Sequence, residues 1–434
     1  MEKARDGRLP PAPGRGGLAA PMMFLLAGCS SAGGIDAINP TRAGASSGDM
    51  GGAEGPSAPA FGSVCGFAAP VALGAPAADG FVDVPPAHPD ILYFGRVDGS
   101  NPRAPQFAFP GVSIRMRFRG DAIDLRLKDF GKGTPGTTND YDVIFDDGAP
   151  QLLRVSPSQQ VYPIGRNLGA GEHTVEVWKR IESAPGGAPG AGKGQMLGFR
   201  LPEGGAVLPL APRPHRIEFI GDSITCGYGD LISVADPSRS PYTTAGSNAA
   251  LAYGAVAARR LNAEYAAVAY SGRGVYRNYL GAPGDTLPRM YGRSLPDDPT
   301  AAPWNTAAWT PDVVVINLGT NDFSEKGTDR SAFRAAYLAF LATLRSYYPR
   351  ATFILAAGPM ISDEAPAGEM AWTKIQADLW RIAASRTAVG DPRVHVLIMP
   401  PQSPPYGEDF HPTAATHASM ADLVVALVKR LENW

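Results

Sequence analysis

The 434-residue chain is predicted to be an α/β protein in which an all-β sandwich of jelly-roll character precedes a domain built on a parallel sheet. Two changes in hydrophobic period predict this order. From residue 64 to residue 208, apolar residues occupy alternate positions, which is typical of half-buried strands. From residue 209 to residue 434, short apolar runs alternate with stretches of helical period, which is typical of a doubly wound parallel sheet.

Within the sandwich, the alternation predicts short strands joined by Gly-rich turns. Residues 112–118 and 123–127 both alternate, and Gly120-Asp121 between them predicts a hairpin. A strand over residues 141–145 is expected to end at Asp147-Gly148, a strong tight-turn signal. A further strand is expected over residues 174–178.

In the second domain, apolar runs are expected to form the parallel sheet. These runs are residues 217–220, 266–269, 313–318, 353–356 and 394–398. Residues 333–344 and 420–431 each place apolar side chains on one helical face, so these two helices are expected to cover the sheet.

Composition excludes several classes of protein. Apolar residues make up 44% of the chain, which is enough for a sizeable core. The 39 Lys and Arg nearly balance the 41 Asp and Glu, so we expect no nucleic-acid partner and no electrostatic binding to a membrane surface. The three cysteines, Cys29, Cys65 and Cys226, are too few and too scattered for a zinc site or a disulfide framework. No metal and no cofactor are expected.

The N-terminal residues are interpreted as a targeting segment. Basic residues precede a short apolar run that ends in Leu26-Ala27-Gly28-Cys29, which is the order of a secretory signal peptide. The run Leu26-Ala27-Gly28-Cys29 resembles a bacterial lipobox. The resemblance implies a lipoprotein signal peptide over residues 1–29 with lipidation of Cys29. Ser30 after it implies sorting to the outer membrane. The alternative is an Ala/Gly-rich leader with a chance cysteine.

The expected location is therefore outside the cytoplasm, at the outer membrane or the cell surface, or released from the cell. Membrane contact is expected only through the lipid anchor. Residues 30–63, which are dominated by Gly, Ala, Ser and Pro, are predicted to form a flexible linker to the sandwich.

Residues able to carry chemistry follow three of the predicted strands, at the sheet edge where open α/β sheets bind ligands. Gly221-Asp222-Ser223 follows the first strand, and a strand-to-helix turn there would expose the serine hydroxyl. Ser271-Gly272-Arg273-Gly274 and Gly319-Thr320-Asn321-Asp322 follow the next two strands, and Glu408-Asp409-Phe410-His411 precedes the last helix.

Together these four stretches resemble the SGNH hydrolase superfamily, and the run from Gly221 to Gly229 behind a β-sandwich resembles carbohydrate esterase family two. The resemblance implies a flavodoxin-like, three-layer αβα catalytic domain with a jelly-roll companion. It also implies removal of acetyl groups from plant polysaccharides or oligosaccharides, such as those of xylan or mannan. Carried onto this sequence, it makes Ser223 the nucleophile and His411 the general base, with Ser223, Gly272 and Asn321 forming the oxyanion hole.

The chemistry requires these residue types. An imidazole that titrates near neutrality can take the serine proton and return it to the leaving alcohol. Backbone N–H groups and a side-chain amide can bind the developing oxyanion. Gly274 is an alternative donor to Gly272. His417 is the nearest rival to His411, but it is expected inside the last helix.

The sequence departs from the superfamily pattern at the acid that orients the histidine. An Asp usually stands three residues before the histidine, whereas here Glu408 holds that place and Asp409 follows it. Glu408 or Asp409 could orient the imidazole, or a backbone carbonyl could do so and leave a Ser/His dyad. Position alone favours Glu408.

Cys226 and several aromatic residues near the expected site could have functional roles, but simple packing explains each of them as well. Cys226, close to the nucleophile, is expected to be a small packing residue. Five aromatic residues are candidates for stacking on sugar rings, although core packing is the stronger default for each. They are Tyr228, Tyr276, Trp304, Trp309 and Trp372.

Two other functions remain as alternatives to polysaccharide deacetylation. One is a lipid or short-chain acyl esterase of the same fold, against which the sandwich and the lack of an apolar lid-like segment argue. The other is a non-catalytic glycan-binding surface lipoprotein, against which the intact Ser, Asn and His set argues.

Overall fold

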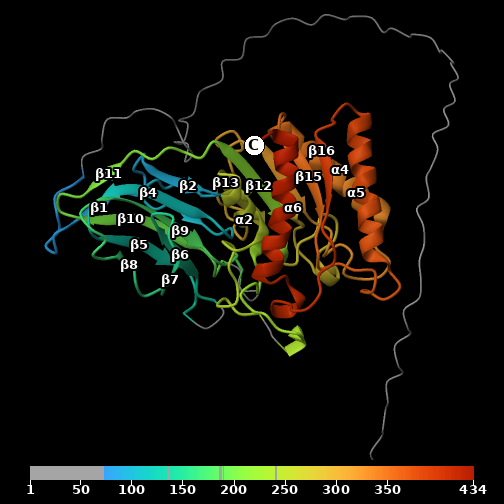
Figure 1. The fold of residues 1–434 in the computed structure, drawn as a ribbon, viewed down its shortest axis with the longest axis horizontal. Helices are drawn as coiled ribbons and strands as arrows, with labels where there is room; N and C mark the ends of the chain where they lie inside the picture. The colour runs from blue at the N-terminus through green and yellow to red at the C-terminus, as the bar shows by residue number, and fades with distance from the viewer. Residues whose placement is uncertain (1–72, 134–136, 185–187, 189, 240–241) are drawn as a thin grey trace, which may run out of the picture. The chain divides into compact units, whose positions relative to one another are not determined.

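The structure is a computed structural model that describes residues 73–133, 137–184, 188, 190–239 and 242–434. The expected signal peptide, Cys29, the linker and Cys65 lie outside the described residues. The described residues belong to one compact unit, in which a β-sandwich is followed by an α/β domain (Figure 1).

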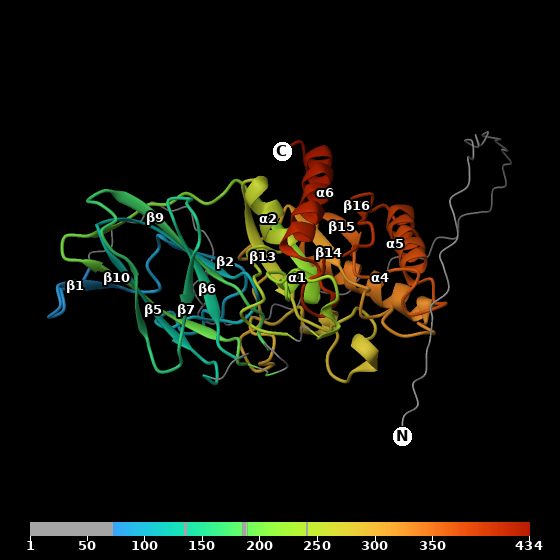
Figure 2. The ribbon, with the colours of Figure 1, turned by 60° about the horizontal axis from the view of Figure 1, so that its bottom comes forward.

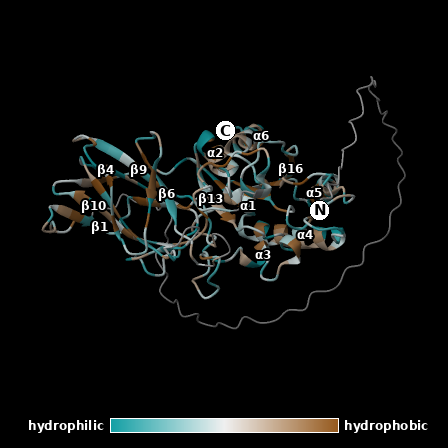
Figure 3. Cartoon of the chain, turned by 90° about the horizontal axis from the view of Figure 1, so that it is seen from below, coloured by the Kyte–Doolittle hydropathy of each residue, from teal (hydrophilic) through white to brown (hydrophobic). Residues whose placement is uncertain are grey.

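Two antiparallel sheets form the sandwich. In the first sheet the strand order is β1-β10-β5-β8, with β3 also paired to β10; in the second it is β11-β4-β9-β6-β7, with β2 also paired to β4. The strands carry both hydrophobic and hydrophilic residues, as expected when one face is buried (Figure 3). Their bounds are β1 Phe81–Val84, β2 Ile91–Phe94, β3 Gln106–Phe107, β4 Ser113–Arg119, β5 Ile123–Asp129, β6 Asp140–Phe145, β7 Gln151–Arg154, β8 Val161–Gly165, β9 Glu172–Lys179, β10 Gly194–Pro202 and β11 Ala206–Leu208.

The hairpin predicted around Gly120-Asp121 is wrong, although both of its strands exist. β4 pairs with β2, β9 and β11, whereas β5 pairs with β8 and β10 in the other sheet. Both strands bury an apolar face in the same core, and they do so from opposite sheets. The turn predicted at Asp147-Gly148 is confirmed, and it joins β6 to β7 as a hairpin. Asp146 and Asp147 have φ values of 51° and 55°, which suit a tight turn between strands.

The second domain contains the predicted parallel sheet, with the order β13-β12-β14-β15-β16. All five predicted strands are confirmed, with ends that differ by a few residues. Their bounds are β12 His215–Gly221, β13 Ala263–Ala269, β14 Val313–Asn317, β15 Thr352–Ala357 and β16 Val394–Ile398.

Helices cover both faces of this sheet and make three layers (Figure 2). Val313 and Val315 of β14 pack into the core shared with α2 and α6, whereas Val314 and Ile316 pack into the core shared with α4 and α5. The long helices are α2 Tyr253–Arg260, α4 Arg330–Tyr347, α5 Ala371–Ala388 and α6 Ala414–Glu432, and the short ones are α1 Ser223–Cys226 and α3 Leu287–Met290. The short 3₁₀ turns are Pro237–Arg239, Tyr279–Gly281 and Glu408–Phe410.

The two predicted amphipathic faces are those that pack on the sheet. In α4 the buried residues include the five expected ones, Phe333, Tyr337, Phe340, Leu341 and Leu344. In α6 most of the expected face is buried, but Leu423 is exposed. Within the described ranges, no helix combines the length and the apolar character that a bilayer span would require.

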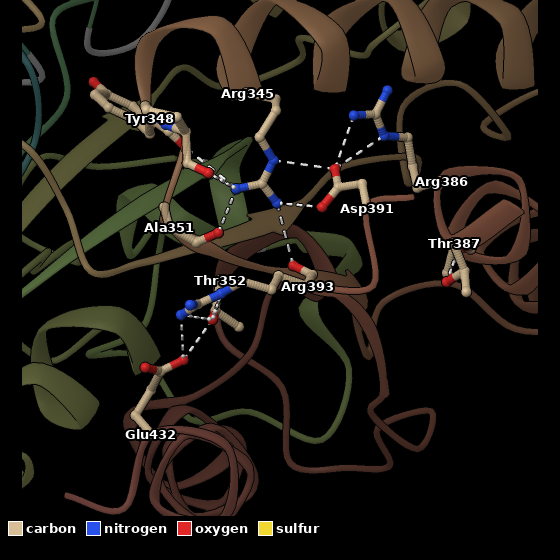
Figure 4. A network of polar contacts seen from close by, with 11 residues as sticks. Arg345, Tyr348, Ala351, Thr352, Arg386, Thr387, Asp391, Arg393 and Glu432 are labelled. Atoms are coloured by element: carbon tan, nitrogen blue, oxygen red, sulfur yellow. Dashed lines mark hydrogen bonds and ion pairs between the residues drawn. The ribbon is translucent and has the colours of Figure 1, made fainter. Parts of the chain in front are cut away.

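Ion pairs and hydrogen bonds tie the helices to the starts of β15 and β16 (Figure 4). Asp391, just before β16, accepts hydrogen bonds from Arg345 of α4 at 2.8 Å and Arg386 of α5 at 2.8 Å. Thr352, the first residue of β15, accepts from Arg393 at 2.9 Å and donates to Glu432 of α6. These contacts fix the strand starts, so the opposite ends have a rigid base.

The sandwich and the α/β domain share a buried ion pair. Arg96, which follows β2, is fully buried and donates to Glu218 of β12 at 3.2 Å. Its guanidinium also donates to the carbonyl oxygens of Tyr291 and Arg293, and it lies 4.3 Å from the centre of the Tyr291 ring. Both charges are thus satisfied away from water, which is required for a buried pair to persist.

Candidate active site

Ser223 and His411 meet at the ends of the parallel strands. Ser223 is the first residue of α1, directly after β12, and His411 lies just before α6. The Ser223 Oγ and His411 Nε2 are 2.7 Å apart, although the residues are 188 positions apart in the sequence. Both side chains are buried. The two residues expected to react therefore lie within hydrogen-bonding distance.

The turn from β12 into α1 places Ser223. Asp222 caps the helix, because its Oδ1 accepts a hydrogen bond from the Ile224 N–H at 3.1 Å. Gly221 leaves no room for a side chain, since a Cβ there would lie 1.9 Å from Thr225 Oγ1. As the first residue of the helix, Ser223 has an N–H without an intrahelical acceptor. That N–H is available at the start of the helix, next to its own hydroxyl.

Backbone carbonyl groups orient the His411 imidazole. Its Nδ1 lies 3.1 Å from the carbonyl oxygen of Glu408 and 3.1 Å from that of Asp409. Because a carbonyl oxygen only accepts, Nδ1 carries the proton and Nε2 is left to accept from Ser223. The arrangement matches the third alternative raised by the sequence, in which a carbonyl replaces the acid.

Two left-handed residues create this arrangement. Asp409 has a φ of 49° and Phe410 a φ of 61°, a conformation that is uncommon outside glycine and costs on the order of 1 kcal/mol or more for each residue. The turn they form lets two successive carbonyls face the same ring nitrogen. Sequence periodicity carries no signal for such a turn.

The prediction that the Glu408 side chain orients the imidazole is wrong, because its carboxylate binds elsewhere. Its carboxylate accepts from the Thr243 N–H at 2.9 Å and from the Thr243 hydroxyl at 2.7 Å. The Glu408 carboxylate is therefore bound to Thr243 and not to His411 Nδ1. The Asp409 carboxylate is exposed and acts on His411 only through its charge.

Burial lowers the pKa of His411 from 6.5 to about 4, against the opposing effects of the Asp409 charge and the two carbonyl contacts. The Tyr228 ring stacks on the imidazole with 4.0 Å between ring centres, and Tyr242 lies 4.6 Å beyond Tyr228. These rings help to exclude water from His411. The imidazole is therefore neutral at ordinary pH, as a proton acceptor must be.

Asn321 and Asp222 link the loops after β12 and β14. The Asn321 Nδ2 donates to Asp222 Oδ2 at 3.2 Å and to the Arg273 carbonyl at 3.0 Å. The Asn321 amide nitrogen is thus held between the ends of three strands, beside the serine turn. Burial raises the pKa of Asp222 to about 7, while its contact with the Ile224 N–H opposes the rise.

The structure separates the roles of Gly272 and Gly274. Gly274 donates to Asn278 Oδ1 at 3.4 Å, and a Cβ there would lie 2.5 Å from Asp322 Oδ2, so close packing requires this glycine. Gly272 has a φ of 76°, and its carbonyl accepts from the Tyr279 N–H at 2.9 Å. Within the part of the chain that the structure describes, its own N–H has no acceptor. Gly272 is the better placed of the two as a donor to a ligand.

Asp322, directly after Asn321, has a structural role in the site that no sequence motif predicts. Its carboxylate accepts from the N–H groups of Val275 at 3.0 Å, Tyr276 at 2.7 Å and Arg277 at 2.9 Å. Asp322 therefore shapes the loop that follows Gly272 and Gly274. Its position directly after Asn321, at a strand end, was the only sequence signal.

His417 and Cys226, the other candidates from the sequence, take no part in the contact between Ser223 and His411. His417 lies inside α6 as expected, and its Nδ1 accepts from the Tyr253 N–H at 3.2 Å. Cys226 is a buried free thiol, as expected. Among the described residues, no group of three or more His, Cys, Asp or Glu could hold a metal ion.

The aromatic candidates differ in exposure. Trp309 is buried and donates to Glu264 at 2.7 Å, whereas Tyr276 is exposed. Two exposed aromatic residues next to the site were not predicted. Tyr279 follows the Gly272 loop and is 53% exposed, and Phe410 precedes His411 and is 47% exposed. Trp304 lies near the buried Arg96, and Trp372 packs beside the core.

Two family models match the chain in succession. Residues 93–212 match the model described as carbohydrate esterase 2 N-terminal, and residues 219–418 match the GDSL-like lipase/acylhydrolase family. The first range covers the sandwich from within β2 onward, and the second covers most of the α/β domain, including both residues of the serine-histidine contact.

Two relatives in sequence carry the word esterase in their names. The chain is 33% identical over 354 residues to the cellulase/esterase CelE of Acetivibrio thermocellus, which covers 80% of this chain but only 40% of CelE. It is 28% identical over 350 residues to an acetylxylan esterase / glucomannan deacetylase of Cellvibrio japonicus, covering 80% of this chain and 90% of that protein.

A solved structure supports the same assignment. A family two carbohydrate esterase from Clostridium thermocellum, in complex with cellohexaose, superposes with a TM-score of 0.70 and 33% identity. The match covers 79% of this chain and 99% of that one. The fold, the order of the two domains and the sequence therefore agree, and the chain belongs to carbohydrate esterase family two, a family of carboxylic ester hydrolases.

Proposed function

We propose that this protein removes O-acetyl groups from plant cell-wall polysaccharides of the xylan or mannan type through an acyl-enzyme on Ser223. The observation that carries the proposal is the contact between Ser223 Oγ and His411 Nε2, with His411 Nδ1 held by carbonyl oxygens. The named relatives include an acetylxylan esterase / glucomannan deacetylase, which supports the substrate class.

The first half of the reaction acylates the serine. His411 Nε2 accepts the hydroxyl proton as Ser223 Oγ attacks the acetyl carbonyl carbon, and negative charge develops on the carbonyl oxygen. The Ser223 N–H, the Gly272 N–H and the Asn321 amide are the donors proposed for this oxyanion. Asn321 would share its amide with its present acceptors, Asp222 and Arg273. The protonated His411 then gives its proton to the departing sugar oxygen.

The second half releases acetate. His411 accepts a proton from water as the water oxygen attacks the acyl carbon on Ser223, and it returns that proton to Ser223 Oγ when the acyl bond breaks. The Glu408 and Asp409 carbonyls keep Nδ1 protonated throughout, and their dipoles stabilise the imidazolium. The cycle thus uses a Ser/His dyad without a carboxylate on the ring.

A matched set of substrates tests this function. Wild type and Ser223→Ala are compared on acetylated xylan and acetylated glucomannan, with acetate release as the measurement. We expect release by the wild type only, and equal release by both would exclude the proposed function. Longer acyl esters distinguish a sugar deacetylase from a lipid esterase, because the proposal expects acetyl to be preferred.

We also propose that the protein is an exported lipoprotein anchored through Cys29, on the basis of the lipobox-like run in the sequence. Incorporation of a labelled fatty acid by the full chain, and its loss in Cys29→Ala, would support the anchor. Equal labelling of both proteins would contradict it.

A further inference from the structure

Glu182 belongs to the segment that follows sandwich strand β9, but its carboxylate lies against the α/β domain. The residue is 4% exposed. Its Oε2 accepts from the Ser271 N–H at 2.9 Å, and its Oε1 accepts from the Ser271 hydroxyl at 2.6 Å. The Cys226 thiol lies 3.9 Å from Oε2 and is oriented to donate to it. One carboxylate therefore contacts two segments of the other domain, the end of α1 and the loop after β13.

These two segments are the ones that supply the backbone donors of the proposed oxyanion hole. Ser271 is directly followed by Gly272, and Cys226 ends the one-turn helix that Ser223 begins. A shift of Ser271 would move the Gly272 N–H with it, because the two residues share a peptide bond. The Glu182 carboxylate thus fixes the place of one donor relative to the other.

The segment around Glu182 is itself held firmly. The Glu182 carbonyl accepts from the buried Lys179 Nζ at 3.3 Å. The same carbonyl packs so closely on Gly192 that a Cβ there would lie 1.9 Å away. Two residues earlier, the Arg180 carbonyl accepts from the Ala249 N–H of the α/β domain at 2.7 Å. The carboxylate is therefore presented from a rigid base.

We propose that Glu182 is a positioning residue for the oxyanion hole, supplied by the sandwich to the α/β domain. The inference rests on the proposed function and adds to it a role for the sandwich. Glu182 acts through Ser271 and Gly272 rather than on the substrate. The sandwich is then a part of the catalytic unit, and its removal would disturb the site even if every α/β residue were kept.

The proposal predicts a loss in kcat with little change in KM. In Glu182→Ala, the Ser271 N–H and hydroxyl lose their acceptor and the Gly272 loop is released. Since the Gly272 N–H is displaced rather than removed, kcat should fall on the order of tenfold to a hundredfold, less than deletion of a donor costs. KM should stay within about threefold, because the interaction matters for the transition state.

The conservative variant distinguishes positioning from bulk packing. In Glu182→Gln, the amide oxygen can accept from the Ser271 N–H while the amide nitrogen donates to the Ser271 hydroxyl, so both contacts survive. Its kcat should lie within about fivefold of the wild type. Ser271→Ala, which removes only the hydroxyl contact, should give a smaller loss than Glu182→Ala and provides a second variant that tests the proposal if Glu182→Ala does not fold.

The matched control is Glu176→Gln, because Glu176 is also a buried glutamate and lies on β9 itself. Its carboxylate accepts from Ser113 of β4 at 3.3 Å and from Arg213, between β11 and β12, at 3.2 Å. Kinetics on an acetyl ester and hydrogen–deuterium exchange at residues 270–274 are measured for all variants. We expect faster exchange and lower kcat in Glu182→Ala, with near wild-type values in Glu182→Gln and Glu176→Gln.

The two readouts separate failure of this inference from failure of the proposed function. If the wild type releases no more acetate than Ser223→Ala, the proposed function is wrong, and the exchange data still show whether Glu182 holds the Ser271 loop. If the wild type is active but Glu182→Ala and Ser271→Ala keep its kcat and its exchange rates, Glu182 is not a positioning residue. A kcat as low in Glu182→Gln as in Glu182→Ala, with unchanged exchange, would also overturn the proposal.

Discussion

The burial of His411 predicts an unusually acidic lower limit of activity. Because the imidazole must be neutral to accept the serine proton, kcat/KM falls as the free enzyme gains a proton on His411. Burial lowers this pKa from 6.5 to about 4. Relative to a histidine of ordinary pKa, this shift favours the neutral form of the ring by about 3 kcal/mol. At about pH 5.5, a histidine of ordinary pKa would be about one tenth neutral, whereas His411 would be almost wholly neutral.

Asp409→Asn tests the source of this value. The Asp409 charge raises the pKa of His411, so its removal should move the acid limb to a still lower pH. Asparagine tolerates the left-handed backbone, and the carbonyl that faces Nδ1 is kept. At neutral pH, kcat should therefore stay within about threefold of the wild type, since no catalytic acid is lost.

The assay is direct detection of acetate over about pH 3.5 to 8, a range set to include both the ordinary and the lowered histidine pKa. Direct detection avoids the ionisation of a coloured leaving group. Samples returned to neutral pH control for irreversible inactivation. An acid limb near pH 6.5 in the wild type, or a hundredfold loss of kcat in Asp409→Asn, would refute the reasoning from burial and from the carbonyl contacts.

Three further changes probe other parts of the structure. Arg96→Met should destabilise the protein by about 3–5 kcal/mol in denaturant unfolding, because Glu218 is left buried without its cation; a loss below about 1 kcal/mol would contradict a buried ion pair of this kind. Asn321→Ala should lower kcat on the order of a hundred- to a thousandfold on an acetyl ester, and an unchanged rate would remove its amide from the oxyanion hole. Glu408→Ala should cost about 1–3 kcal/mol of stability, because the N–H and hydroxyl of Thr243 lose their acceptor. A large fall in kcat with unchanged stability would instead restore Glu408 as the orienting acid.

Local patterns predicted most of the secondary structure. The parallel strands β13, β14 and β15 are apolar runs because both of their faces are buried, whereas the edge strand β16 is mostly half-buried. The buried face of α4 is predicted correctly because its five buried residues recur at helical spacing. The predicted hairpin failed because the choice of partner strand is not local. β4 and β5 have the right alternation, but their pairing depends on β9 and β10, which come much later in the chain.

The site was predictable only in part, for similar reasons. Three motifs at strand ends and a fourth before the last helix indicated Ser223 and His411, but the orientation of the imidazole depends on two positive φ values and on the reach of one glutamate. The spacing of residues in the sequence predicts neither the φ values nor the contact of the glutamate. The contact of Glu182 with Ser271 could not be predicted from the sequence, because the two residues belong to different domains and are 89 positions apart. Long-range contacts of this kind follow from the packing of two domains, which no single motif encodes.

The most direct measurement is mass spectrometry of the enzyme quenched in acid during turnover of an acetyl ester. We predict one acetyl group on the peptide that contains Ser223, absent from Ser223→Ala and strongly reduced in His411→Ala at early times. An acetyl group that never appears on Ser223 while acetate is released, or turnover that persists in Ser223→Ala, would contradict the serine-histidine mechanism.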